Sequence, residues 1–216
     1  NTINTTGSNG EIGINFGTQD TVINNVISTA NVGIQGGGGV TGFNVTNNTI
    51  FIRSGSGNAM IVNGGNGTIA FNSINVTGNN ALSVRLQGSG NISFFSNKIN
   101  SSSTRQDAVF VESPGNIIHS NVINSTAGGS VSHGLSAGHG IALDNLNNTV
   151  YLNNISTNSR DGIFVRLSNN TIHSNRINTI TGTGIFFTVS ASPTINNTLM
   201  FNNIINTTGS IADGIN

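Results

Sequence analysis

The sequence of 216 residues contains no cysteine and no tryptophan, and charged residues make up only 6% of it. Without cysteine the chain has no disulfide framework and no thiolate metal site. Its 7 basic and 7 acidic residues cancel, so no electrostatic footprint indicates nucleic acid or an anionic membrane as a partner. No run approaches the roughly 18 apolar residues that a membrane-spanning helix requires.

No signal peptide is recognisable, and the first residue already lies inside a repeat. We therefore expect a mature product or a piece of a longer protein. Apolar residues account for 35% of the chain, and their strict register argues against disorder.

The repeat is the tripeptide Asn-x-Ile, of which nine copies follow one another at intervals of 22 to 32 residues along the chain. A unit of this length, continued along the chain, indicates a solenoid. We predict a single domain over residues 1–216, with a Gly/Ser-rich loop inserted at 126–139.

Each repeat has the pattern of three short strands. In residues 68–91, strands are predicted at 68–71, 73–76 and 81–86, with Asn, Gly and Ser between them. The third strand begins with a small residue followed by alternating apolar positions, as in Ala81-Leu82-Ser83-Val84 and Gly162-Ile163-Phe164-Val165. This alternation predicts an all-β, parallel β-helix of about eight coils.

The repeated asparagines are predicted at a corner between two strands. Asparagine tolerates the left-handed region better than any residue except glycine. Coils stacked about 4.8 Å apart would bring identical side-chain amides within hydrogen-bonding distance. The predicted internal ladder consists of Asn25, Asn48, Asn72, Asn97, Asn121, Asn153, Asn175 and Asn202.

Three short strands per coil, a corner asparagine ladder and stacked aliphatic residues resemble the right-handed parallel β-helix of the pectate-lyase-like superfamily. The closest resemblance is to the Asn-rich repeats of bacterial and archaeal secreted and surface proteins. It covers essentially the whole chain. Since that superfamily includes lyases, hydrolases, tailspikes, adhesins and scaffolds, the resemblance implies a fold and leaves the function open.

In that superfamily, catalysis usually takes place on the outer face of the strand that here begins with glycine or alanine. Three phenylalanines, Phe110, Phe164 and Phe186, are predicted to face outward from this strand on coils five, seven and eight. Such an apolar stripe can bind a partner or a sugar, or it can be covered by the inserted loop.

Two residues further along the same strand, Glu112 is predicted to lie over Asp144, with Arg85 and Arg166 on either side. This set is either a surface ion ladder, which we favour, or an acid/base pair or Ca²⁺ site. Three further titratable residues are predicted just before this strand on adjacent coils, namely Asp107, His139 and Asp161. The simplest interpretation of an Asp that precedes Gly, such as Asp161, is a turn residue. If the chain is an enzyme, its catalytic candidates are Asp107, Glu112, His139, Asp144, Asp161 and Arg166.

No cofactor or metal site is predicted, apart from the alternative of Ca²⁺ at Glu112 and Asp144. His119 and His173 share an outward column but lie two coils apart, about 9–10 Å, which is too far for one zinc ion. The motif Asn-x-Ser/Thr marks candidate N-glycosylation sites. These are Asn4, Asn44, Asn47, Asn66, Asn75, Asn91, Asn100, Asn124, Asn147, Asn154, Asn169, Asn196 and Asn206.

Scarce acid/base residues and repeats without a capping element at either end favour a structural or adhesive rod. We expect it outside the cell or on the cell surface, joined to other copies of itself or to adjoining β-helix segments, with polysaccharide as a further candidate partner. The alternative is a polysaccharide-active lyase or glycoside hydrolase, with its site on coils five to seven.

Overall fold

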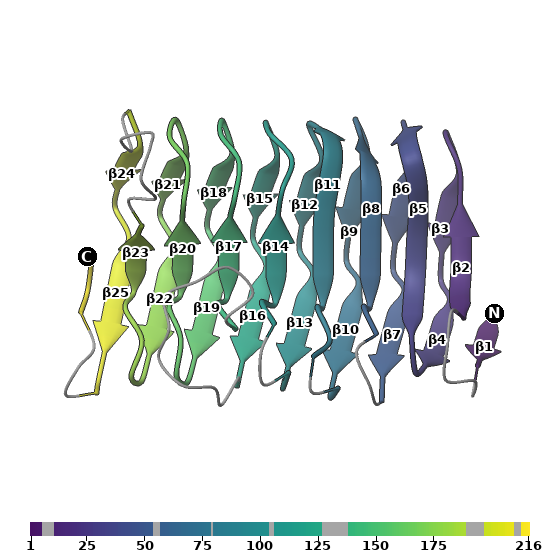
Figure 1. Cartoon of the computed structure of the whole chain (residues 1–216), viewed down its shortest axis with the longest axis horizontal. Coiled ribbons are helices and arrows are strands. Elements are labelled where there is room, and N and C mark those ends of the chain that lie inside the picture. The colour runs from purple at the N-terminus through teal and green to yellow at the C-terminus, as the bar shows by residue number, and fades with distance from the viewer. Residues whose placement is uncertain are drawn as a thin grey trace.

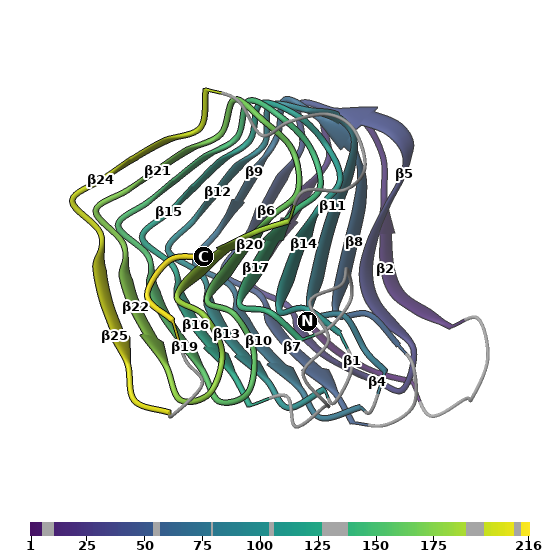
Figure 2. The same ribbon diagram turned by 60° about the vertical axis from the view of Figure 1, so that its left-hand side comes forward.

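The computed structural model describes residues 1–5, 11–53, 57–78, 80–103, 106–126, 138–188, 197–209 and 213–216. In these residues the chain forms 25 β-strands and no helix. The strands wind into a parallel solenoid with one sheet on each of three sides (Figures 1 and 2). No helix in the described residues is long and apolar enough to cross a membrane.

Each coil passes through sheet C, then sheet A, then sheet B, and each strand pairs in parallel with the corresponding strand of the next coil. Sheet A contains β1 (Thr2–Asn4), β4 (Val26–Thr29), β7 (Thr49–Ile52), β10 (Ser73–Val76), β13 (Lys98–Ser101), β16 (Val122–Ser125), β19 (Asn154–Thr157), β22 (Arg176–Thr179) and β25 (Ile204–Thr207). Sheet B contains β2 (Ile12–Phe16), β5 (Val32–Thr41), β8 (Met60–Gly65), β11 (Val84–Gly90), β14 (Val109–Val111), β17 (Ile141–Leu143), β20 (Ile163–Val165) and β23 (Ile185–Phe187). Sheet C contains β3 (Thr21–Ile23), β6 (Asn44–Thr46), β9 (Thr68–Ala70), β12 (Ser93–Phe95), β15 (Ile117–His119), β18 (Thr149–Tyr151), β21 (Thr171–His173) and β24 (Leu199–Phe201).

The core is a set of aliphatic columns that run along the solenoid. In every coil but the last, the isoleucine of the periodic Asn-x-Ile motif faces inward from sheet A, and residues such as Ile99 and Ile155 are fully buried. They pack against the small residue that begins the sheet B strand. A Cβ added at Gly140 would lie 2.5 Å from Cγ2 of Ile155 and 2.7 Å from the carbonyl oxygen of Gly162. The small residue is therefore required for close packing between sheets.

The internal asparagine ladder is confirmed, as Asn97 illustrates. Its Nδ2 lies 3.0 Å from the carbonyl oxygens of Ile69 and Phe95, and 3.1 Å from Oδ1 of Asn121. Its Oδ1 accepts hydrogen bonds of 3.0 Å from the backbone N–H and from Nδ2 of Asn72. Each ladder asparagine therefore bonds to the asparagine of the next coil and also donates hydrogen bonds to carbonyl groups at the ends of strands.

The corner itself is not made by the ladder residue, contrary to our expectation. The left-handed conformation belongs to the residue just before it, which includes Phe71 (φ 58°) and Leu152 (φ 54°) as well as Asn24 and Ser96. The ladder asparagine follows the bend, with its side chain inside. Asparagine is needed there for its paired donor and acceptor, and the bend tolerates several residue types.

In the last coil the predicted ladder member was wrong by one residue. Asn175 donates to Oδ1 of Asn203 at 3.0 Å, and Asn203 donates to the carbonyl of Ile172, whereas Asn202 is exposed and has φ 55°. Correspondingly, Ile205 pairs with Ile177. Residues 199–205 read Leu-Met-Phe-Asn-Asn-Ile-Ile, so apolar alternation fits either register equally well.

A second register error concerns the coil that contains β11. Val84 pairs with Met60 and Val109, so the strand equivalent to Ala108-Val109-Phe110-Val111 is Ser83-Val84-Arg85-Leu86. The prediction had placed it two residues earlier. A shift of two preserves which residues face inward, so the hydrophobic pattern does not reveal it.

Candidate functional site

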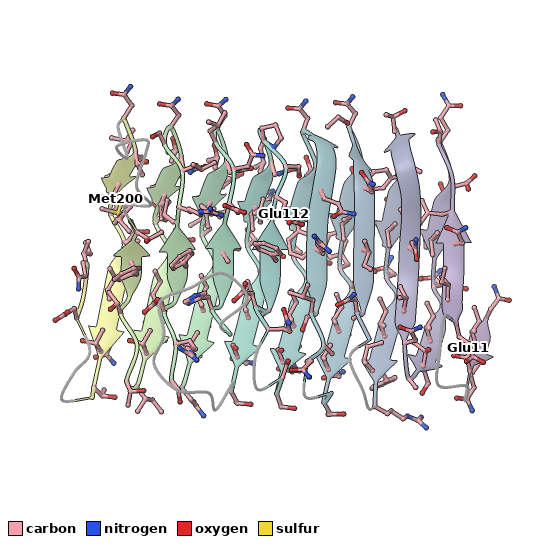
Figure 3. The ribbon with its side chains drawn as sticks, viewed as in Figure 1. Glu11, Glu112 and Met200 are labelled. Carbon is pink, nitrogen blue, oxygen red and sulfur yellow. The ribbon has the colours of Figure 1, made fainter. Side chains whose placement is uncertain are left out.

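The predicted ion ladder lies on the outer face of sheet B, where Figure 3 labels Glu112. Nε and Nη2 of Arg85 both donate to the Glu112 carboxylate, the latter at 3.0 Å. Nη1 of Arg166 donates to Oδ1 of Asp144 at 2.9 Å. Because of the register shift in β11, Arg85 lies beside Phe110 and not in the column of Glu112, and its guanidinium carbon is 5.9 Å from the centre of that ring.

The two ion pairs differ in their electrostatics. The hydrogen bond to Glu112 raises the pKa of the Arg85 guanidinium. Burial raises the pKa of Asp144, and the charge of Glu112 adds to this rise, although Arg166 acts in the opposite direction. Partial burial of Asp144 thus favours its protonated form more than full exposure to water would.

Asp107 and Asp161 are buried and serve the backbone of the next coil. Oδ1 of Asp107 accepts from the backbone N–H groups of Gly138 at 3.0 Å and His139 at 2.9 Å. Oδ1 of Asp161 accepts from the N–H of Thr183 at 2.9 Å. We had expected aspartates that act within their own turns. The backbone that these two carboxylates bind belongs instead to the following coil.

His139 joins this buried group. Its Nδ1 lies 3.3 Å from Oδ2 of Asp161, and its ring stacks on Phe164 with 4.6 Å between ring centres. The structure thus brings together Asp107, His139 and Asp161, as predicted. In the coil of β11, the register shift puts Leu82 at the position equivalent to Asp107.

Arg160 was not identified from the sequence. It is 7% exposed, and burial lowers the pKa of its guanidinium while the charges of Asp161 and Asp107 raise it. The run Asn-Ser-Arg-Asp-Gly at 158–162 looks like an ordinary turn, so the only sequence signal for Arg160 was its position next to the candidate residue Asp161.

The phenylalanine stripe exists but is largely covered. Phe110 and Phe164 are 5% and 1% exposed, and they form a second apolar cluster with Leu82 and Ala142, against which the half-buried Phe186 packs. His139 covers part of Phe164. Residues 127–137 of the predicted loop lie outside the described residues. A sugar could reach Phe110 and Phe164 only if the residues that cover them moved.

A longer aromatic row runs along the outer face of sheet C. Its rings stack face to face, with centres 4.6–5.0 Å apart and interplanar angles of 2–14°. The stacked residues are Phe95, His119, Tyr151, His173 and Phe201. The one-residue shift in the last coil places Phe201 at the end of this column, where it pairs with His173. Because the rings cover one another's faces, the row stabilises sheet C more than it offers a stacking surface.

The histidines of this row are oriented by their neighbours. Nδ1 of His119 lies 3.2 Å from Oγ of Ser120, and His173 has the same contact with Ser174. Burial lowers the pKa of His119. The described residues contain no group of three or more His, Cys, Asp or Glu that could hold a metal ion. A Ca²⁺ site at Glu112 and Asp144 stays a prediction, and in this structure both carboxylates are paired with arginine.

Two further asparagine rows were missed. One is buried where sheet B turns into sheet C and consists of Asn116, Asn148 and Asn170. The other lies on the outer face of sheet A and consists of Asn75, Asn100 and Asn124. The 24- or 25-residue spacing of the outer row was visible in the sequence, but with so many asparagines it did not stand out.

None of the predicted glycosylation asparagines in the described residues is buried, and Asn196 lies outside them. Asn47, Asn66, Asn91, Asn147 and Asn169 are exposed corner residues with positive φ. The amides of Asn75, Asn100 and Asn124 are instead engaged with one another. Glycosylation of any of these sites stays a prediction.

The stacked coils match a family model described as "Right handed beta helix region" over residues 58–215. The chain belongs to this family. Among solved structures, this β-helix is similar to a mutant of the periplasmic alginate epimerase AlgG, with a TM-score of 0.63 and 17% identity. The alignment covers 87% of this chain and 50% of that one, so the β-helix spans half of its length. At this identity the likeness shows the fold alone. A search of curated proteins finds no match.

Proposed function

We propose that the chain is a structural or adhesive β-solenoid, located outside the cell or on its surface. One observation carries this proposal: the predicted acid/base residues are engaged in contacts that hold the coils together. Glu112 and Asp144 are paired with arginines, and Asp107 and Asp161 accept hydrogen bonds from the next coil's backbone. A catalytic group must instead be able to reach its substrate.

The arrangement of the ladders supports the same role. Amide rows occur inside and outside the solenoid, and each row repeats the same contact from coil to coil. Such nearest-neighbour contacts allow a solenoid to be extended by further coils. We therefore propose adjoining β-helix segments or other copies of the chain as its axial partners.

The rod proposal is tested by looking for activity and for assembly. The purified protein is incubated with a panel of neutral and acidic polysaccharides, and released or modified products are measured by chromatography. We expect no turnover. Electron microscopy of the native material should show elongated rods or filaments. Sustained turnover by the wild-type protein, together with isolated short particles, would refute the proposal.

A second candidate function is a polysaccharide-active lyase or glycoside hydrolase on coils five to seven. The observation that favours it is the two ion pairs Arg85–Glu112 and Arg166–Asp144 on one outer face, which include a carboxyl group of raised pKa. The similar solved structure is that of an alginate epimerase, which is consistent with this candidate.

The enzyme candidate predicts that Asp144→Asn and Asp161→Asn abolish product release. Asp213→Asn is the control, because Asp213 is an exposed carboxylate in the last coil. Thermal unfolding of each variant separates loss of activity from loss of fold. If activity is found and both Asp144→Asn and Asp161→Asn retain it, the site lies elsewhere.

A further inference from the structure

A groove lies on the outer face of sheet A, across β10, β13 and β16. It encloses about 170 Å³. Two parallel rows of side chains line it: the amides of Asn75, Asn100 and Asn124, and the hydroxyls of Thr77, Ser102 and Thr126. No residue of the lining carries a formal charge, and most of the surface that it exposes is carbon, with the amide and hydroxyl groups set along it. The groove therefore suits an uncharged ligand that presents both apolar C–H faces and polar groups.

The amide row offers both donors and acceptors. Nδ2 of Asn100 donates to Oδ1 of Asn75 at 2.9 Å, and Nδ2 of Asn124 donates to Oδ1 of Asn100 at 3.0 Å. An amide has two N–H bonds and two oxygen lone pairs, and the row uses one of each at Asn100. The second N–H and the second lone pair remain available to a ligand.

The hydroxyl row complements it. Thr77 donates to the carbonyl of Ile52 at 3.0 Å, and Ser102 donates to the carbonyl of Val76 at 3.1 Å. Since a hydroxyl has one proton and two lone pairs, both oxygens keep acceptor capacity. The groove therefore has mixed donors and acceptors on one side and acceptors on the other.

Both rows repeat once per coil. Strand pairing keeps Asn75, Asn100 and Asn124 in register, so the groups recur about every 4.8 Å along the axis. A peptide strand advances about 3.3 Å per residue and would fall out of step. An extended β-1,4-linked glycan advances by nearly one coil per sugar, and each of its hydroxyls can both donate and accept.

The same column supplies an aromatic ring at one end of the groove. Phe51 pairs in register with Asn75 and is half-buried. An aromatic face packs against the C–H face of a sugar ring, as it does against other apolar surfaces. The ring and the amide row thus lie in one line along the solenoid.

We propose that this groove binds a neutral, extended β-1,4-linked polysaccharide that lies parallel to the solenoid axis. The proposal names a ligand for the adhesive role proposed above. It rests on that proposed function, but the two can fail separately. Rod assembly and the absence of turnover are measured in one set of experiments, and glycan binding is measured in another.

The test uses protein made in a host without N-glycosylation, since Asn75, Asn100 and Asn124 are also candidate glycosylation sites. Binding of neutral β-1,4-linked glucose and N-acetylglucosamine oligosaccharides is measured by calorimetry, with polygalacturonate as the acidic comparison. We expect the wild-type protein to bind a neutral oligosaccharide and not the acidic polymer. Asn100→Asp, which replaces a donor with a charge, should weaken binding about tenfold or more.

Asn15→Asp is the matched control, because Asn15 is an exposed asparagine on the outer face of sheet B. It should leave binding unchanged. Thr77→Val, which removes one acceptor of the other row, gives a second reading if Asn100→Asp disturbs the fold, as judged by circular dichroism. Absence of binding to every neutral oligosaccharide, preference for the acidic polymer, or equal affinity in Asn100→Asp, Thr77→Val and Asn15→Asp would overturn the proposal.

Discussion

The two corners that flank sheet C bend the chain in the same way but stabilise the bend differently. At both corners a residue with positive φ comes first. At the corner from sheet C to sheet A, an asparagine follows in each coil from Asn25 to Asn203. At the corner from sheet B to sheet C, the following residue is apolar or glycine in the early coils (Phe43, Gly67, Ile92) and asparagine only in the later ones (Asn116, Asn148, Asn170).

The length of the preceding strand explains the difference. β5 and β11 run to the corner as long strands of 10 and 7 residues. They remain paired with β8 up to the corner, apart from an irregularity in each strand, between Gly36 and Val40 in β5 and between Gln87 and Gly90 in β11. β14, β17 and β20 have three residues each and are followed by a turn. In these turns the asparagine amide donates to carbonyls that the sheet does not pair, as Asn116 does to Ser113 and Asn148 to Asn145. Buried amides thus occur where the backbone leaves the sheet.

The largest effect is expected at the continuous ladder. Asn97→Leu removes the donor to the carbonyls of Ile69 and Phe95 and to Oδ1 of Asn121. It also leaves the backbone N–H of Asn72 without its acceptor, whereas Nδ2 of Asn72 loses one of its three partners. Since each buried unsatisfied group costs about 1–3 kcal/mol, we expect a loss of about 3 kcal/mol or more in the free energy of unfolding, measured in urea.

The control for this change is Asn202→Ser. We had wrongly assigned Asn202 to the ladder, and other coils have serine at the equivalent corner position, as at Ser96 and Ser120. This substitution should change stability by less than about 1 kcal/mol. Comparable losses in both variants would contradict the role assigned to the buried amides.

A smaller effect is expected at the discontinuous ladder. Asn148→Leu leaves the backbone N–H of Asn116 without its acceptor and the turn carbonyl of Asn145 without this donor, while Nδ2 of Asn116 keeps its bonds to Ser113. This turn is also closer to the surface, and water can reach part of it. We expect a loss of about 2 kcal/mol in urea unfolding. A loss larger than that of Asn97→Leu would reverse the proposed ranking of the two corners.

The smallest effect is expected from the row of stacked rings on sheet C. This row contains titratable histidines, whereas the two asparagine ladders do not titrate, so only the row should make stability depend on pH. Burial lowers the pKa of His119 below 6.5 in the folded state, so the unfolded chain binds the proton more readily. The contribution of neutral His119 to stability is therefore complete above about pH 6.5 and is lost as pH falls through the folded-state pKa.

His119→Phe keeps a ring in the stack and should reduce the loss of melting temperature between pH 7 and pH 5 relative to the wild-type protein. Asn97→Leu should lower the melting temperature at both pH values by a similar amount. An unchanged pH dependence in His119→Phe would show that the stacked imidazole does not contribute to it.

The sequence by itself determined the repeat, the three-strand coil and the continuous ladder from Asn25 to Asn175. These features follow from the identity of residues at a fixed period, since stacking identical coils places identical side chains over one another. It also predicted that Asp107, His139 and Asp161 would meet, because they precede equivalent strands on successive coils.

Only the tertiary structure decided the exact neighbours. The two-residue shift at β11 moved Arg85 beside Phe110, and the one-residue shift in the last coil replaced Asn202 with Asn203. Alternating apolar residues are unchanged by a shift of two, and a continuous apolar run is unchanged by a shift of one. Burial of Phe110 and Phe164 likewise depends on side-chain contacts between coils. Local pattern cannot specify such contacts, because they are set by the register of strands that lie more than twenty residues apart.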